Sequence, residues 1–223
     1  MSAPTAGPAP DRSSPIVTVR GEAQLEGPPD LATVMVSVHS TSDTAEQARA
    51  ELAAASSGIS GLLQRFVQAV DRSSTTGLHI GPVFDQRSFT RIIGYRGSYS
   101  TEIVLADLDA LSPLLLEAAA LPNGQVSGPW WSLRPDNPLH RQVRLEAITD
   151  ARRRADDYAF AVRASVSALL EISDVDAGFG GDVGMRSMLA AGAPEAASFD
   201  FEPALQRVWG HVVVRYALSP PAA

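Results

Sequence analysis

Residues 92–105 read IIGYRGSYSTEIVL, and this stretch decides the fold class. Ile93 and Ile103 fall on one face of the stretch, whereas Arg96 and Glu102 fall on the other. Side chains alternate between the two faces of a strand, so this period of two predicts a strand that is buried on one side only. Strands solvated on one face are typical of antiparallel sheets.

Two further strands are predicted before this one, at residues 16–25 and 31–40. Between them lies Gly27-Pro28-Pro29-Asp30, which is turn chemistry because proline fixes φ and donates no hydrogen bond. We therefore predict that the two strands form an antiparallel hairpin. The remaining predicted strands are residues 78–89, 125–133, 166–175 and 207–218.

The first helix is predicted from a cap and a spacing. Asp43 is the expected N-cap and Glu46 its capping-box partner. Apolar residues then follow in steps of three and four from Ala45 to Val70, which places them on one stripe of a helix. The polar face is expected to be solvated.

Two more helices are predicted further along the chain. Asp107 or Asp109 is expected to cap a short helix that ends before Asn123-Gly124. Asn137-Pro138 predicts the start of a long helix that runs to about residue 164, because Asn is a favoured N-cap and Pro suits the first helical position. The predicted core stripe of this helix is Val143, Ala147, Ala151, Ala155, Ala159 and Val162.

Hairpins followed by helices favour an α+β fold, with an antiparallel or mixed sheet and helices packed on one side, over a doubly wound parallel sheet. We predict one domain over residues 16–218, with tails at residues 1–15 and 219–223. Residues 176–206 are rich in Gly and Ala with weak periodicity, which predicts a flexible insertion loop. The 223 residues are enough for a sizeable core.

The composition excludes several kinds of chemistry. The formal net charge of −7 disfavours nucleic-acid binding, which depends on cationic side chains that neutralise phosphates. All 18 basic residues are arginine, so no Schiff-base or P-loop lysine exists. The chain has no cysteine, which excludes disulfides, thiolate metal sites and cysteine nucleophiles.

Location is predicted from the start of the sequence. Residues 1–15 have neither a basic start nor an apolar run, unlike a secretory signal peptide. No stretch approaches the roughly 18 apolar residues of a transmembrane helix. We predict a cytoplasmic protein, with export to the cell envelope as the alternative if the start is truncated or misassigned.

Several candidate motifs fail when their context is considered. The run Gly178–Gly184 suggests a dinucleotide cradle, but the sixth position of G-x-G-x-x-G is Val183, so a flexible loop is favoured. The sequence around Ser60 is one residue short of G-x-S-x-G and lies within a predicted helix. The carboxylate pairs are read as caps or turns rather than cation ligands: Asp107 with Asp109, and Asp174 with Asp176.

The four histidines show no metal-binding spacing. No pair lies at i and i+4, so a metal site would need ligands from separate elements. We predict surface or hydrogen-bonded roles for His39, His79, His140 and His211. The sequence thus predicts no catalytic, cofactor-binding or metal-binding residue.

Two further groups are candidates for contact roles. Trp130 and Trp131 are neighbours in a predicted strand, so one ring is expected in the core and the other outside, where it suggests an interface. Residues 152–154 are three consecutive arginines, read as a solvated helix face paired with Asp156 and Asp157. An anion or lipid-headgroup patch is the alternative reading.

The order of these motifs resembles the SIMPL-domain family, from about residue 16 to residue 218. The individual motifs are short, and the resemblance comes from their order and spacing together. The motifs that carry it are IVTVRGEA at 16–23, PDLATV at 29–34, YRGSY at 95–99, IVLADL at 103–108, AITDARRRA at 147–155 and VVVRYAL at 212–218.

The resemblance implies an α+β fold, no accepted catalytic residues, and self-assembly into large oligomers in some members. It also implies export to the cell envelope and a link to stress tolerance, although this sequence lacks the export signal of many bacterial members. An animal relative is named for association with a signalling kinase.

We therefore hypothesise a non-enzymatic protein that acts as a homo-oligomer or by binding a protein partner, with the strand at 16–25 as a pairing edge. The alternative is an enzyme for a small ligand, or one that depends on a metal, with residues 176–206 as a lid. A third hypothesis is an envelope-associated scaffold.

Overall fold

The computed structural model describes residues 15–85, 90–174 and 199–222. Its elements follow in this order: β1 (Ile16–Gly27), β2 (Leu31–Ser42), α1 (Ala45–Arg65), β3 (Val70–Phe84), β4 (Ile92–Leu105), the 3₁₀ turn η1 (Leu108–Ala110), α2 (Leu111–Ala119), β5 (Gly124–Ser132), α3 (Pro138–Ala161), β6 (Val166–Asp174) and β7 (Gln206–Leu218).

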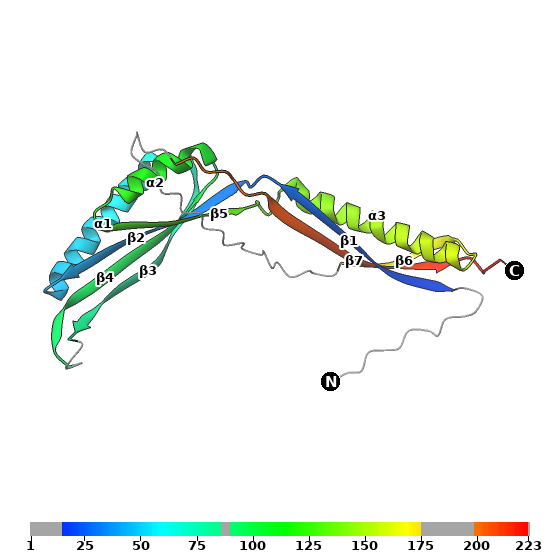
Figure 1. The fold of residues 1–223 in the computed structure, drawn as a ribbon, viewed down its shortest axis with the longest axis horizontal. Helices are drawn as coiled ribbons and strands as arrows, with labels where there is room; N and C mark the ends of the chain where they lie inside the picture. Colours follow the sequence, from blue (N-terminus) through cyan, green and yellow to red (C-terminus); the bar gives the residue numbers. More distant parts are fainter. Residues whose placement is uncertain (1–14, 86–89, 175–198, 223) are drawn as a thin grey trace. The chain divides into compact units, whose positions relative to one another are not determined.

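The described strands form two antiparallel sheets, with strand orders β1-β7-β6 and β3-β4-β2-β5. The chain divides into two compact units (Figure 1). Unit 1 holds β1, α3, β6 and β7, and unit 2 holds the other elements. The predicted α+β class, with antiparallel strands and helices packed against them, is confirmed, although the sequence predicted one sheet and the structure has two. The predicted domain and tail boundaries stay a prediction.

The predicted hairpin of the first two strands is wrong. β1 pairs with β7, whereas β2 lies between β4 and β5 in the other sheet. The connection holds Pro28-Pro29 and lacks the Asn-Gly or Asp-Gly pair that favours a tight hairpin turn. The chain therefore leaves one sheet after Gly27 and enters the other at Leu31.

In unit 2, α1 and α2 pack on one face of the four-stranded sheet. The N-cap of α1 is Thr44 instead of the predicted Asp43, and its hydroxyl accepts the Gln47 N–H at 3.2 Å. The helix ends at Arg65, so the predicted continuation to Val70 is wrong, because Val70 begins β3. The core is formed by these buried side chains: Ala32, Val34, Val36, Val38, Leu52, Ile59, Leu62, Ile103, Leu105, Leu111, Leu114, Leu115 and Ala118.

The end of the predicted insertion loop belongs to unit 2. The backbone N–H of Phe199 donates to the Ser112 hydroxyl at 3.0 Å, and Phe201 packs against the core. These contacts hold the chain against α2 just before β7 begins. Residues 176–198 of the predicted loop lie outside the described residues.

In unit 1, α3 packs on the sheet along its predicted stripe of small residues. Asn137 caps the helix as predicted, with its side chain accepting the Leu139 N–H at 2.9 Å. Of the predicted stripe, Val162 is the exception, because it caps the C-terminal end of the helix and is 51% exposed. The buried stripe residues are Val143, Ala147, Ala151, Ala155 and Ala159. The three central alanines form one core cluster with Val19, Val212, Val214 and Tyr216 on the sheet.

Candidate functional site

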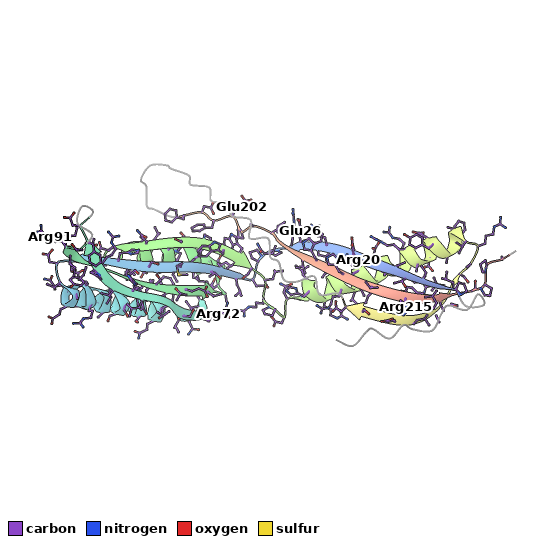
Figure 2. The ribbon with its side chains drawn as sticks, turned by 90° about the horizontal axis from the view of Figure 1, so that it is seen from below. Arg20, Glu26, Arg72, Arg91, Glu202 and Arg215 are labelled. Carbon is purple, nitrogen blue, oxygen red and sulfur yellow. The ribbon has the colours of Figure 1, made fainter. Side chains whose placement is uncertain are left out.

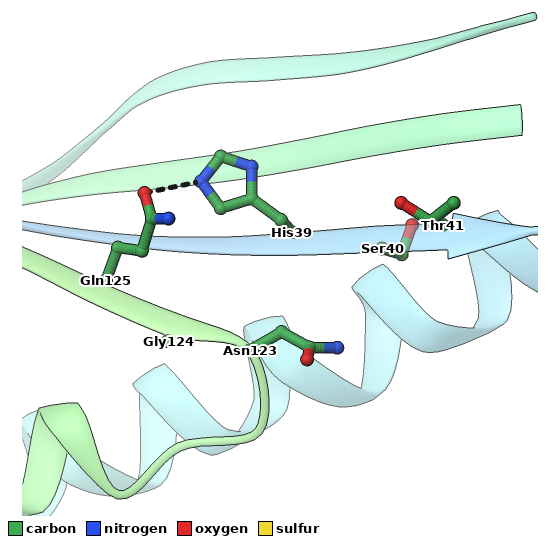
Figure 3. Close-up of a pocket in the computed structure, with 6 residues that line it drawn as sticks. All are labelled: His39, Ser40, Thr41, Asn123, Gly124 and Gln125. Carbon is green, nitrogen blue, oxygen red and sulfur yellow. Dashed lines mark hydrogen bonds between the residues drawn. The ribbon is translucent and has the colours of Figure 1, made fainter. Parts of the chain in front are cut away.

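A polar hollow of about 420 Å³ lies in unit 2, where β5 begins beside β2 (Figure 3). The register of the two strands ends with Val38 opposite Gly124, and one further backbone bond joins the His39 N–H to the Asn123 carbonyl at 3.3 Å. The hollow lies where β2 continues to Ser42 beyond the first residue of β5 and so has no β5 residue beside it. Its lining residues are His39, Ser40, Thr41, Asn123, Gly124 and Gln125.

The side chains of this hollow offer hydrogen bonds but no catalytic arrangement. His39 Nε2 lies 3.1 Å from Gln125 Oε1, so the ring is turned toward β5 (Figure 3). The Ser40 hydroxyl donates to the carbonyl of Ala48 in α1 at 3.4 Å, so its hydrogen is already used within the protein. None of the lining residues is a carboxylate that would orient His39 as a base. The arrangement suits hydrogen bonding to a neutral polar molecule.

Two of the four histidines share one row of the sheet. His79 on β3 and His39 on β2 are both register partners of Ser98 on β4. His140 and His211 belong to the other unit. Within the described ranges, no three His, Asp or Glu residues are placed to hold a metal ion. The predicted surface and hydrogen-bonded roles fit His39, and the metal-dependent alternative stays a hypothesis.

The face of the unit 1 sheet that turns away from α3 carries paired charges. Arg20, Glu26 and Arg215 stand along β1 and β7 (Figure 2). The ion pairs are Arg20 with Glu22 at 2.9 Å, Arg207 with Glu26 at 2.6 Å, and Arg215 with Glu171 at 3.1 Å. Exposed pairs of this kind contribute little stability, and here each arginine is matched by a glutamate. The face is therefore charge-balanced, which gives no basic surface for phosphate binding.

Strand β6 forms one edge of the same sheet and is unusually apolar for its exposure. Leu169, Leu170 and Ile172 are 54%, 50% and 48% exposed. The sequence predicted the strand but not its exposure. Its apolar residues fall on both faces, which normally indicates a strand buried on both sides. An edge strand with such side chains is a typical site for pairing with another chain.

The opposite edge of this sheet, β1, is contacted by a carboxylate from α3. The backbone N–H of Glu22 donates to Asp150 Oδ2 at 3.1 Å. Arg153 Nη2 lies 2.7 Å from Asp150 Oδ1, and Arg154 Nε lies 2.8 Å from Oδ2. Desolvation raises the pKa of Asp150, but the hydrogen bonds from Arg153 and Glu22 and the arginine charges outweigh it and lower the pKa overall.

The three consecutive arginines of α3 have different partners. Arg152 pairs with Asp156 at 3.0 Å, as predicted, and its guanidinium carbon lies 5.7 Å from the centre of the Tyr216 ring. Arg153 and Arg154 instead pair with Asp150. The spacing of Asp150 three and four residues before Arg153 and Arg154 was a signal for these pairs that the sequence reading missed. The contact of Asp150 with Glu22 could not be predicted from spacing, because the two residues are 128 positions apart.

The remaining candidates have structural placements. Trp131 packs against the core and Trp130 is 36% exposed, as the alternation predicted. Asp107 caps η1 by accepting the Asp109 N–H at 3.1 Å. The Ser60 hydroxyl donates to the Ser56 carbonyl within α1 at 3.0 Å. The glycine run at 178–184 and Asp176 lie outside the described residues.

Comparison with known proteins identifies one matching family model and no matching curated protein. The family model described as SIMPL, a protein of unknown function (DUF541), matches residues 17–216. No curated protein matches the chain. In the described part of the chain, every helix is too short or too polar to cross a membrane.

Proposed function

The chain belongs to the SIMPL family, whose function is unknown, and from that premise we propose that this protein acts by self-association through strand β6. The observation that carries the proposal is the edge position of β6 combined with the half-exposed Leu169, Leu170 and Ile172. An edge strand offers unpaired backbone groups, and its apolar side chains gain from burial against a second copy.

The two edges of the other sheet are less suited to pairing. β3 carries Asp71 and Arg72 near its start and Pro82 near its end, and β5 carries Pro129. Proline cannot donate to a ladder, and charges at an edge oppose strand addition. β6 reads VSALLEISD and has no proline, and its two charged residues, Glu171 and Asp174, lie in its second half, after Leu169 and Leu170.

The expected gain is moderate. Full burial of a leucine or isoleucine side chain is worth about 1.5–3 kcal/mol, so about 1 kcal/mol remains for each half-exposed side chain of β6. Association also has an entropic cost. The surface area that one pair of strands buries is small compared with the roughly 1,600 Å² of a standard interface. We therefore expect weak self-association that becomes visible only as the protein concentration is raised.

A concentration series in sedimentation equilibrium tests the proposal. The Leu170→Lys and Ile172→Lys variants should raise the Kd about tenfold or more, since a charged side chain opposes pairing. The matched control is Leu78→Lys, which changes a 65% exposed leucine on β3 and should leave the Kd unchanged. A wild-type protein that stays monomeric from micromolar to millimolar concentration would contradict the proposal.

Location and biological role are separate proposals. We place the protein in the cytoplasm, with the cell envelope as the alternative, and cell fractionation distinguishes the two. The stress-related role and the binding of a different protein partner rest on family resemblance. Affinity purification with mass spectrometry from the native cell, repeated with Leu170→Lys, separates a partner held by β6 from one held elsewhere.

A further inference from the structure

We infer that association through β6 stops at a two-fold dimer, because Asp150 closes β1, the opposite edge of the same sheet, against a further strand. This inference rests on the proposed function. It adds that the strand paired with β6 is β6 of a second copy in antiparallel orientation. It also gives the reason why the assembly does not grow beyond two copies.

Among the described strands, the order β1-β7-β6 leaves two edges at which the sheet of unit 1 could be extended. If both edges accepted a strand, β6 of one copy would pair with β1 of the next, and this head-to-tail contact would give rings or filaments. If only β6 accepts a strand, the contact must be between two identical edges. Such a contact is self-complementary and closes after two copies.

One backbone donor of β1 is occupied by a charge-assisted hydrogen bond. The Glu22 N–H donates to a carboxylate oxygen of Asp150 and so is not available to a neighbouring strand. The side chain of Asp150 is only 13% exposed, and two arginines hold it in place. A strand that approached β1 at this point would have to compete with the Asp150 carboxylate for the Glu22 N–H.

The acidic half of β1 adds to this closure. A shallow hollow between β1 and α3 is lined by Glu22, Ala23, Gln24, Glu146, Thr149, Asp150 and Arg153. Three of these side chains are carboxylates and one is a guanidinium. Arg215 already pairs with Glu171, so a β6 strand added at this edge would bring Asp174 as a further carboxylate.

Charge also selects the orientation of β6 against β6. The acidic residues Glu171 and Asp174 lie in the second half of the strand, and Arg163 lies just before its start. A parallel pair would place identical carboxylates side by side, which is destabilising. An antiparallel pair places Asp174 of each copy toward the end that carries Arg163 of the other.

Light scattering coupled to size exclusion tests the inference with two variants of one residue. The mass of the wild type should level off at two chains as concentration rises. Asp150→Ala removes the acceptor and should give assemblies larger than a dimer, whereas Asp150→Asn keeps an oxygen acceptor and should stay closer to the wild-type mass. Adding Leu170→Lys to Asp150→Ala should abolish growth, because head-to-tail pairing needs both edges.

The outcomes separate the inference from the proposed function. A monomeric wild type contradicts self-association itself. A wild type that grows past two chains, or an Asp150→Ala variant that stays a dimer, overturns only the closure by Asp150. If Asp150→Ala fails to fold, disulfide cross-linking of single-cysteine variants tests the inference instead, because the chain has no native cysteine. Leu170→Cys should cross-link into dimers and Gln24→Cys should not, and the reverse result overturns the inference.

Discussion

The Gly21→Val substitution is expected to lower the free energy of unfolding by about 3 kcal/mol or more, at the upper end of what overpacking costs. A Cβ at this position of β1 would lie 2.0 Å from the Ala147 carbonyl oxygen and 2.7 Å from the Ala151 Cβ. Both atoms belong to α3, and the first is backbone, so neither can turn aside. Relief requires the helix to move away from the sheet, which would break the packing of its alanine stripe.

Urea denaturation followed by circular dichroism measures the loss, and hydrogen exchange locates it among the amides of α3, β1 and β7. The matched control is Gly77→Val on β3, where a Cβ meets nothing within 4 Å. Valine suits a strand, so this control should leave stability unchanged or slightly raise it. If both variants lose the same free energy of unfolding, the contact of Gly21 with α3 is not the cause of the destabilisation.

Local patterns were sufficient to predict most elements of this chain. The alternation in residues 92–105 matches β4, and Asn137-Pro138 marks the start of α3. These features depend on residues close together in sequence, where periodicity and capping act. The wrong extension of the first helix to Val70 has the same origin. Val70 lies four residues after Phe66 and so continues the apolar spacing of the helix, although it already begins β3.

Strand pairing could not be predicted in this way. The predicted hairpin assumed that neighbouring strands pair, yet β1 pairs with the last strand of the chain. The alternation of a strand indicates which face is buried but not which strand lies beside it. The result is a sheet in unit 1 built from both ends of the chain.

The candidate sites show the same limit. The motif that contains Asp150 and Arg152 is visible in the sequence, but its physical roles need partners on distant strands. Asp150 accepts the Glu22 N–H, and Arg152 lies over the Tyr216 ring. Likewise, the apolar residues of β6 indicated burial, and only the strand order shows that they lie at an edge. The sequence predicted β1 as the pairing edge, and the contact with Asp150 argues for β6 instead.

The Leu105→Ala substitution is expected to destabilise unit 2 by about 3 kcal/mol, within the range for deleting a buried leucine side chain. Leu105 is fully buried in β4, with Ala32 on β2 and Val70 on β3 as register partners. The flanking ladders hold the backbone in place and Ala32 is too short to fill the space, so a cavity should remain. Leu78→Ala makes the same change at an exposed position of this sheet and should cost about 0.5 kcal/mol or less. Urea denaturation compares the two free energies of unfolding, and similar values would mean that Leu105 does not belong to a tightly packed core.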